Sequence, residues 1–175
     1  MIKSYDFNNE AIKLLKEAIN LSARGEMIHD TLSRSAHMKG LQGFKRWHKV
    51  QSKEDRCHRV DLQHYVIDMF SENLEPSWEE LEGVKEPLSI KEHLELYLDW
   101  EIEVYTTIAS ISNRLVAKFP KESEKVLKPL CGVSKEIEKI RRWLQDFEFT
   151  GYDASYIKLV DKMLHDKVKE IEEKE

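Results

Sequence analysis

The chain is poor in the residues that interrupt helices or link segments covalently. Its 175 residues include only six glycines, four prolines and two cysteines, so we expect long regular elements. Cys57 and Cys131 stand far apart and lack the pair spacing of a zinc motif. In a cytoplasmic protein we expect both thiols to be free, although a disulfide between them stays open. Cys57 is interpreted as a small, buried apolar side chain.

The chain also lacks long apolar runs and an excess of positive charge. No apolar run approaches the about 20 residues of a membrane-spanning helix, and the polar segment 1–9 is unlike a signal peptide. The net charge of −5 disfavours nonspecific binding to nucleic acid, which requires a basic surface. Lys139, Arg141 and Arg142, the densest basic cluster, are interpreted as a solvated face. These features predict a cytoplasmic protein without nucleic-acid or membrane partners.

Motifs of nucleotide-dependent and nucleophilic enzymes are missing as well. The sequence contains no P-loop and no dinucleotide-binding fingerprint. None of its serines has the flanking glycines of a nucleophile elbow. Hydrolases, kinases and nucleotide-dependent enzymes are therefore weak candidates.

What the chain does have is strong helical periodicity. Apolar residues recur every three or four positions, and the alternation of a β-strand is absent. Ser89 and Glu92 form a predicted capping box before the third helix, and Asp153 is predicted to cap the last one. Pro129 is expected to kink the fourth helix or to delay its start. The expected helices cover residues 8–38, 44–70, 90–118, 121–147 and 153–171.

The connections between these helices predict their arrangement. Short breaks at 39–43 and at Pro120 make each adjacent pair an antiparallel hairpin, whereas the connection 71–87 is long enough to cross the length of a helix. Two hairpins joined by one long crossover form a ferritin-like, up-down-down-up four-helix bundle. We therefore predict an all-α fold with the bundle over residues 1–150. The C-terminal fifth helix and charged tail, residues 151–175, are expected to belong to the same domain.

Three ionisable residues interrupt the apolar helical faces. Asp55 and His58 lie on the second expected helix, and Glu101 lies on the third. Charged groups are costly to bury unless they are paired or bind a metal ion. The pattern therefore predicts either a metal site or a buried polar network.

A second polar group lies on the first expected helix. Glu26 and His29 are three residues apart and therefore share one helical face. His48 and Gln51 of the antiparallel second helix could lie opposite them. We expect either a displaced second metal site or a surface or subunit-contact face, and we prefer the second of these two interpretations.

Two segments resemble bacterial-type ferritins. Residues 40–69, GLQGFKRWHKVQSKEDRCHRVDLQHYVIDM, are similar to the passage in which a glycine-containing turn precedes a helix with the pattern E-E-x-x-H. Residues 88–101, LSIKEHLELYLDWE, resemble the start of the third ferritin helix, which ends on a ligand glutamate. Residues 152–164 are similar to the short fifth helix. The resemblance spans most of residues 12–164. It implies a cytoplasmic homo-oligomer that stores or binds iron, such as a 24-subunit shell.

The resemblance also implies the residues of a ferroxidase site, in which carboxylates and a histidine bind two irons. Asp55 stands at the position of the bridging carboxylate, His58 at that of the histidine, and Glu101 at that of the third-helix glutamate. Glu54 and Glu136 match two acids of a third, outer iron site that some bacterial members carry.

The departures from the family pattern leave about half of that site. Ser22 replaces the first-helix glutamate, and Ser134 and Ile137 replace the fourth-helix ligands. Three alternatives follow: a working di-iron site, a single iron, zinc or manganese ion with weak Fe(II) oxidation, or a metal-free network with protonated His58 between the two carboxylates. In the metal-free case we expect a non-catalytic ferritin-fold protein that assembles or binds a partner.

Overall fold

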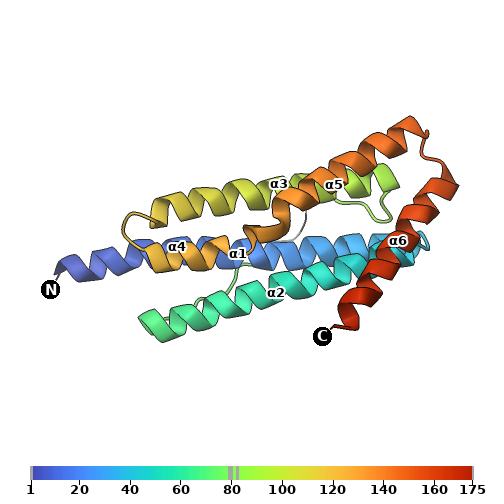
Figure 1. Cartoon of the computed structure of the whole chain (residues 1–175). Coiled ribbons are helices and arrows are strands. Elements are labelled where there is room, and N and C mark those ends of the chain that lie inside the picture. Colours follow the sequence, from blue (N-terminus) through green and yellow to red (C-terminus); the bar gives the residue numbers. More distant parts are fainter. Residues whose placement is uncertain (1, 79–80, 82, 175) are drawn as a thin grey trace.

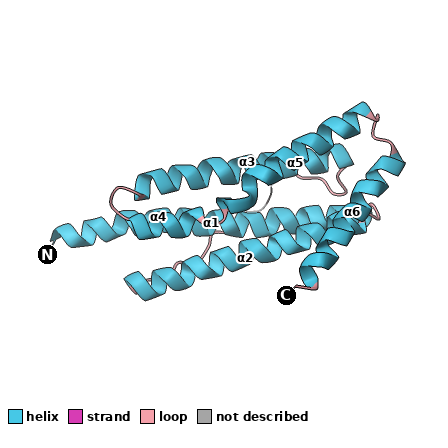
Figure 2. Ribbon diagram, in the orientation of Figure 1, coloured by secondary structure: helices cyan, strands magenta, loops and turns pink. Residues whose placement is uncertain are grey.

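Six helices form the regular structure of the chain. The computed structural model describes residues 2–78, 81 and 83–174, with side chains from residue 9 onward. Four long helical segments lie side by side in Figure 1, and the described residues contain no strand (Figure 2). This all-α architecture confirms the predicted fold class. The helices are α1 (Ile2–Met38), α2 (Gln42–Phe70), α3 (Ile90–Leu115), α4 (Pro120–Leu127), α5 (Leu130–Phe149) and α6 (Ala154–Glu172).

The chain passes through the bundle in the predicted up-down-down-up order. α1 and α2 form an antiparallel hairpin, and α3 begins at the same end of the bundle as α2 (Figure 1). α3 consequently runs in the same direction as α2, and α4 and α5 run back against α3. α1 packs against both α2 and α3, so it is the helix of the first hairpin that contacts the second hairpin.

The fourth helical segment is interrupted at Pro129. α4 ends at Leu127 and α5 begins at Leu130, so Lys128 and Pro129 separate the two helices. Proline has no N–H group and its ring collides with the preceding turn, so a continuous helix through this residue would be strained. Ile137 still faces the core, as the apolar periodicity predicts.

Both predicted helix caps are present. Glu92 donates its N–H to Ser89 Oγ, and its carboxylate accepts the N–H of Ser89. The carboxylate of Asp153 accepts hydrogen bonds from the N–H groups of Ser155 and Tyr156. These bonds satisfy N–H groups that have no partner within their own helices, which fixes where α3 and α6 begin.

α6 crosses the end of the bundle where α1 turns into α2 (Figure 1). A Cβ atom at Gly43 would lie only 1.7 Å from the carbonyl oxygen of Asp161, so glycine permits direct backbone contact. The Asp161 carboxylate also accepts the N–H of Phe44 at 2.9 Å, because Leu41 at the N-cap of α2 offers no side-chain acceptor. α6 therefore supplies the missing cap of α2.

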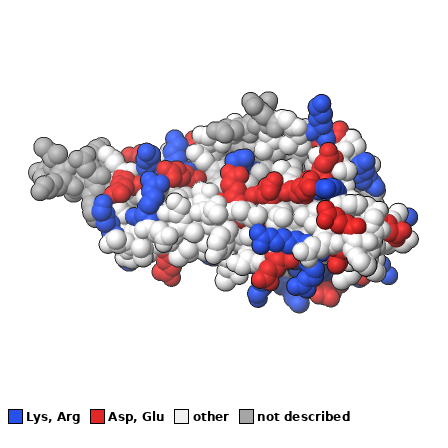
Figure 3. Space-filling model, turned by 90° about the horizontal axis from the view of Figure 1, so that it is seen from above, with Lys and Arg blue, Asp and Glu red and all other residues white. Residues whose placement is uncertain are grey.

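The surface carries charges of both signs, interspersed over the face shown in Figure 3. Lys139 departs from the predicted solvated face, because its side chain is only 24% exposed and pairs with Glu136. Its ammonium group also lies over the rings of Trp47 and Trp143. Burial against the aromatic rings thus removes Lys139 from the basic cluster. Within the described part of the chain, we find no helix with the length and apolarity needed to cross a membrane.

Both cysteines are free and exposed. The prediction of a buried Cys57 is wrong, because the side of α2 that carries it lines a surface hollow.

Candidate metal centre

Three helices bring two carboxylates to one histidine in the core. His29 of α1 has its Nε2 atom 3.7 Å from Asp55 Oδ2 of α2 and 4.0 Å from Glu101 Oε1 of α3. Glu101 is 5% exposed and His29 is 2% exposed. The structure therefore brings together two of the residues that the sequence motif predicts, around a histidine from outside that motif.

Gly25 makes room for this approach. A Cβ atom at this position would lie 2.2 Å from Asp55 Oδ2 and 2.9 Å from Trp100 Cζ2. Both distances are shorter than a non-bonded contact allows, so any larger residue would displace Asp55 or the indole ring. Because Gly25 has no side chain, Asp55 of α2 and Trp100 of α3 can pack directly against the backbone of α1.

The two carboxyl groups are held in their protonated forms. Burial raises the pKa of Asp55 well above its ordinary value, and the neighbouring Glu101 charge raises it further. Burial, followed by the charge of Glu136, raises the pKa of Glu101 to about 8. Both shifts favour the protonated carboxyl groups at neutral pH, although the Lys139 charge partly opposes the shift of Glu101. A divalent cation bound between them would favour the ionised forms.

His29 begins a chain of three buried histidines. Its Nδ1 atom lies 3.1 Å from Nδ1 of His48, and Nε2 of His48 lies 2.9 Å from Nε2 of His93. The three rings come from α1, α2 and α3, and none is more than 2% exposed. The preference for a surface face at His29 and His48 is therefore wrong, because packing of α2 against α1 covers both rings.

Burial keeps the three imidazoles neutral. Desolvation lowers the pKa of His29 to about 3 and that of His93 to about 4. Desolvation and the two neighbouring rings lower the pKa of His48 well below its ordinary value. A neutral imidazole has one N–H donor and one acceptor nitrogen, so the chain can satisfy each contact with a single donated proton.

A second series of hydrogen bonds links Trp47 of α2 through Tyr97 of α3 to Glu136 of α5. Trp47 Nε1 donates to the Tyr97 hydroxyl at 3.0 Å, and that hydroxyl donates to Glu136 Oε1 at 2.9 Å. Glu136 also pairs with Lys139. The Lys139 charge lowers the pKa of Glu101, whereas the Glu136 charge raises it, so both groups act electrostatically on Glu101.

His58 and Glu54 lie on a different side of α2. Both line a surface hollow of about 580 Å³ that also contains Lys128 of the α4–α5 junction and Ile171 of α6. Neither Asp55 nor Glu101 lines this hollow. Burial and the Lys128 charge lower the pKa of His58. The structure therefore does not gather the E-E-x-x-H motif into one group.

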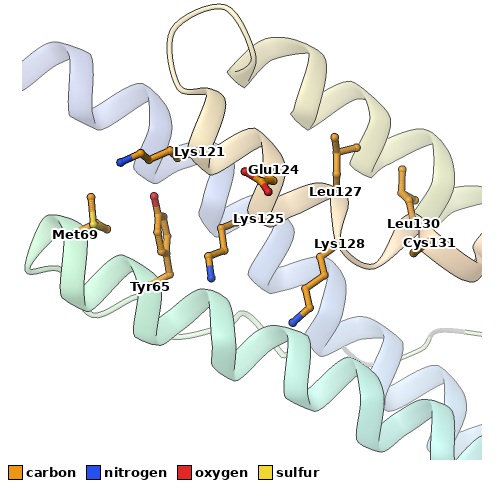
Figure 4. A pocket seen from close by; sticks show the side chains of 9 residues that line it. All are labelled: Tyr65, Met69, Lys121, Glu124, Lys125, Leu127, Lys128, Leu130 and Cys131. Carbon is orange, nitrogen blue, oxygen red and sulfur yellow. The ribbon is translucent and has the colours of Figure 1, made fainter.

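Lys128 also lines a larger groove between α2 and the α4–α5 segment. Figure 4 shows Tyr65 and Met69 of α2 on one wall, facing Lys125 and Lys128 on the other. The groove has a volume of about 1000 Å³, and Lys128 pairs with Asp61 at 3.6 Å. The break at Pro129 thus lies beside open space along the outer side of α2.

A di-iron centre does not fit these residues. Ser22 is buried but offers only a hydroxyl group, Ser134 is exposed, and Ile137 offers no donor atom. Across residues 2–78, 81 and 83–174, no three or more His, Cys, Asp or Glu side chains are already arranged to hold a metal. The positions at which the family pattern places ligands on the first and fourth helices therefore carry no carboxylate in this chain.

A single ion fits the donor chemistry of the central group better. Ligand atoms about 2.1 Å from one ion lie roughly 3.0–3.4 Å from each other. The separations of 3.7 Å and 4.0 Å around His29 Nε2 would therefore need to shorten by less than about 1 Å. Two carboxylates and one neutral imidazole would also balance the charge of a divalent ion.

Helical periodicity could have indicated His48 and His93, which lie outside the E-E-x-x-H pattern. His48 precedes Asp55 by seven residues and His93 precedes Glu101 by eight, which is about two helical turns in each case. Each histidine should therefore share the face of the acid that follows it. Periodicity does not give the orientation of each helix about its own axis. The structure gives it, and it shows that the three faces meet at His29.

Comparison with solved structures identifies archaeal ferritins as similar in fold. An open-pore ferritin from the hyperthermophilic archaeon Archaeoglobus fulgidus matches with a TM-score of 0.77 at 18% identity, covering 89% of this chain and 94% of that one. A humanized archaeal ferritin matches with a TM-score of 0.76 at 16% identity, covering 90% and 96%. An engineered closed form of the Archaeoglobus fulgidus ferritin matches with a TM-score of 0.73 at 18% identity, covering 89% and 94%.

These similarities establish the ferritin fold of the chain. No protein-family model matches the sequence, and no curated protein matches it. At such low identity the shared fold does not transfer an activity, because function depends on the residues of the site.

Proposed function

We propose that this chain is a ferritin-fold protein that binds one iron ion between α1, α2 and α3. The observation that carries the proposal is the convergence of Asp55 and Glu101, from two helices, on the buried ring of His29. Two acids in a bundle core destabilise the fold when they ionise, and a divalent cation offsets that cost. The expected complex has one ion per chain and not a pair.

Iron is the metal that we assign to the site. Carboxylate oxygens with one imidazole suit Fe(II), and they also suit Mn(II) and Zn(II). The similar solved structures are described as ferritins, which favours iron among the three metals. Glu136 would act on the ion as an additional acid near Glu101. The sequence motif also predicts Glu54 and His58 as ligands, but both line the outer hollow, which contains neither central acid.

Rapid oxidation of Fe(II) is not expected. Two-metal sites hold their ions about 3.5–4 Å apart, and Ser22 and Ile137 leave the second ion without carboxylates. We infer weak ferroxidase activity at most, with iron binding or storage as the main role. Storage would take place in a cytoplasmic homo-oligomeric shell, of 24 subunits if it follows the bacterial-type ferritins that the sequence resembles.

Anaerobic calorimetric titration with Fe(II) tests this proposal on the full-length protein. We expect saturation near a single equivalent per chain, and at least about a tenfold loss of affinity in the double variant Asp55→Asn/Glu101→Gln. Glu138→Gln is the matched control, because Glu138 is an exposed acid on α5. The absence of saturable binding, or equal binding by the double variant, would contradict the proposal.

A metal-free assembly protein is the second candidate, and a specific observation favours it. The raised pKa values of Asp55 and Glu101 favour their protonated forms, the lowered pKa values of the three histidines favour neutral rings, and Glu136 already pairs with Lys139. This network needs no added cation. Under this candidate, excess Fe(II), Mn(II) or Zn(II) would leave the melting temperature unchanged, whereas a bound ion would raise it.

A further inference from the structure

The position of His29 relative to the two acids distinguishes it from His58. Nε2 of His29 faces both Asp55 Oδ2 and Glu101 Oε1, at 3.7 Å and 4.0 Å. His58 lines the outer hollow with Lys128 and Asp61, and the hollow includes neither of those acids. A cation at His58 would also meet the positive charge of Lys128, which acts on that ring.

We propose that His29, and not His58, is the imidazole ligand of the metal site, and that His48 and His93 fix the ring of His29 for this role. The proposal rests on the metal site between α1, α2 and α3 described under Proposed function. It replaces the predicted trio of Asp55 and His58 from α2 and Glu101 from α3 by a set with one ligand from each of α1, α2 and α3.

The histidine chain allows only one proton arrangement when His29 binds a metal. Its Nε2 atom must then present a lone pair, so Nδ1 carries the proton and donates it to Nδ1 of His48. His48 in turn carries its proton on Nε2 and donates it to Nε2 of His93. All contacts in the chain are satisfied by three neutral rings, and each proton points away from the metal.

This chain acts as the support that metal-binding histidines usually require. A ligand histidine generally donates its second ring N–H to a neighbouring acceptor, which sets both its tautomer and its orientation. His48 supplies that acceptor, and it is fully buried, so water does not compete for the bond. The ring of His29 also packs edge-on against Tyr97, with 5.5 Å between the ring centres. These contacts hold Nε2 of His29 toward the acids.

Cobalt(II) absorption separates the two histidines, with Co(II) alone as the probe. We expect the wild-type protein to develop ligand-field bands that saturate, and His58→Ala to bind Co(II) with unchanged affinity. His29→Asn and His29→Ala should each lose about ten- to a hundredfold in affinity, and His48→Leu should weaken binding within the same range. Circular dichroism melts of each metal-free variant verify that the helices are intact.

Nitrogen NMR of the wild-type protein gives a readout that needs no variant. With ¹⁵N-labelled histidine, Zn(II) should shift Nε2 of His29 and leave Nδ1 of the same ring protonated. A shift at His58 without one at His29, or lost Co(II) binding in His58→Ala with intact binding in His29→Asn, would overturn the assignment of His29. A wild-type protein that binds neither Co(II) nor Zn(II) would instead overturn the metal site itself.

Discussion

Glu101 links the protonation of the core to the stability of the fold. Its pKa is raised to about 8, mainly by burial, so the folded protein retains a proton that the unfolded chain releases above its ordinary pKa. The resulting stabilisation is complete below the ordinary pKa of a glutamate. It is lost as the pH rises through about 8.

Glu101→Gln removes this dependence, because glutamine does not ionise. Between about pH 5 and 8 without metal, the wild-type free energy of unfolding should fall relative to the variant by a few kcal/mol, at most about 5. Urea unfolding at several pH values in a chelating buffer measures the difference. Parallel pH profiles of the two proteins would show that Glu101 is not held protonated.

Gly25 has a steric role that Gly132, a helical glycine with open space around it, does not have. Gly25→Ala should destabilise the fold by about 1–3 kcal/mol, because the new methyl group meets Asp55 and Trp100. Gly132→Ala on α5 is the matched control, since its added methyl group has no neighbour within 4 Å and should stabilise the fold by about 0.5–1 kcal/mol. Thermal melts of both variants measure the two effects, and equal effects would contradict this role of Gly25.

The sequence revealed the chemistry of single residues better than their partners. The sequence predicts that Asp55 and Glu101 are unusual because charges interrupt apolar faces. The structure places both beside the buried ring of His29, with Glu101 buried and the Asp55 side chain 23% exposed. The motif also predicted His58 beside them, but a position three residues from Asp55 needs only a modest helix rotation to face outward. Local spacing does not fix that rotation, which the packing of α2 against α1 and α6 determines.

At the level of whole helices, the docking of α6 depends on Gly43. Gly43→Ala should separate α6 from α2, because the added methyl group overlaps the backbone of Asp161. Loss of the Asp161 cap on α2 would add to a destabilisation of roughly 2–3 kcal/mol. Hydrogen exchange should become faster across residues 154–172, with Gly132→Ala again as the control. Unchanged exchange in this helix would contradict the close backbone contact.

Helix boundaries were predictable where side chains specify them. Ser89, Glu92 and Asp153 form the expected caps, because these side chains satisfy backbone groups within a few residues of themselves. The Asp161 cap of α2 was not predictable, since it comes from a residue more than a hundred positions away. Pro129 indicated the interruption of the fourth segment, but not the groove that lies beside it.

For the whole molecule, the proposed shell requires faces on which subunits meet. Phe149, Leu159 and Met163 are exposed near the junction of α5 and α6, and Phe149 is 93% exposed. Leu159→Glu/Met163→Glu should therefore reduce the size of the assembly, because it places charge on an apolar face. Val116→Glu is the control, since Val116 is a comparably exposed residue on another part of the bundle. Light scattering measures the mass, and a wild-type monomer would contradict the shell.

Metal content tests the central claim most directly. Elemental mass spectrometry of the full-length protein, purified without chelators from iron-supplemented cells, counts the ions that each chain retains. The account predicts at least one equivalent of iron per chain, with a larger content if the shell stores iron, and near-complete loss in Asp55→Asn/Glu101→Gln. Metal occupancy below a few per cent in the wild-type protein, or equal occupancy in the double variant, would contradict it.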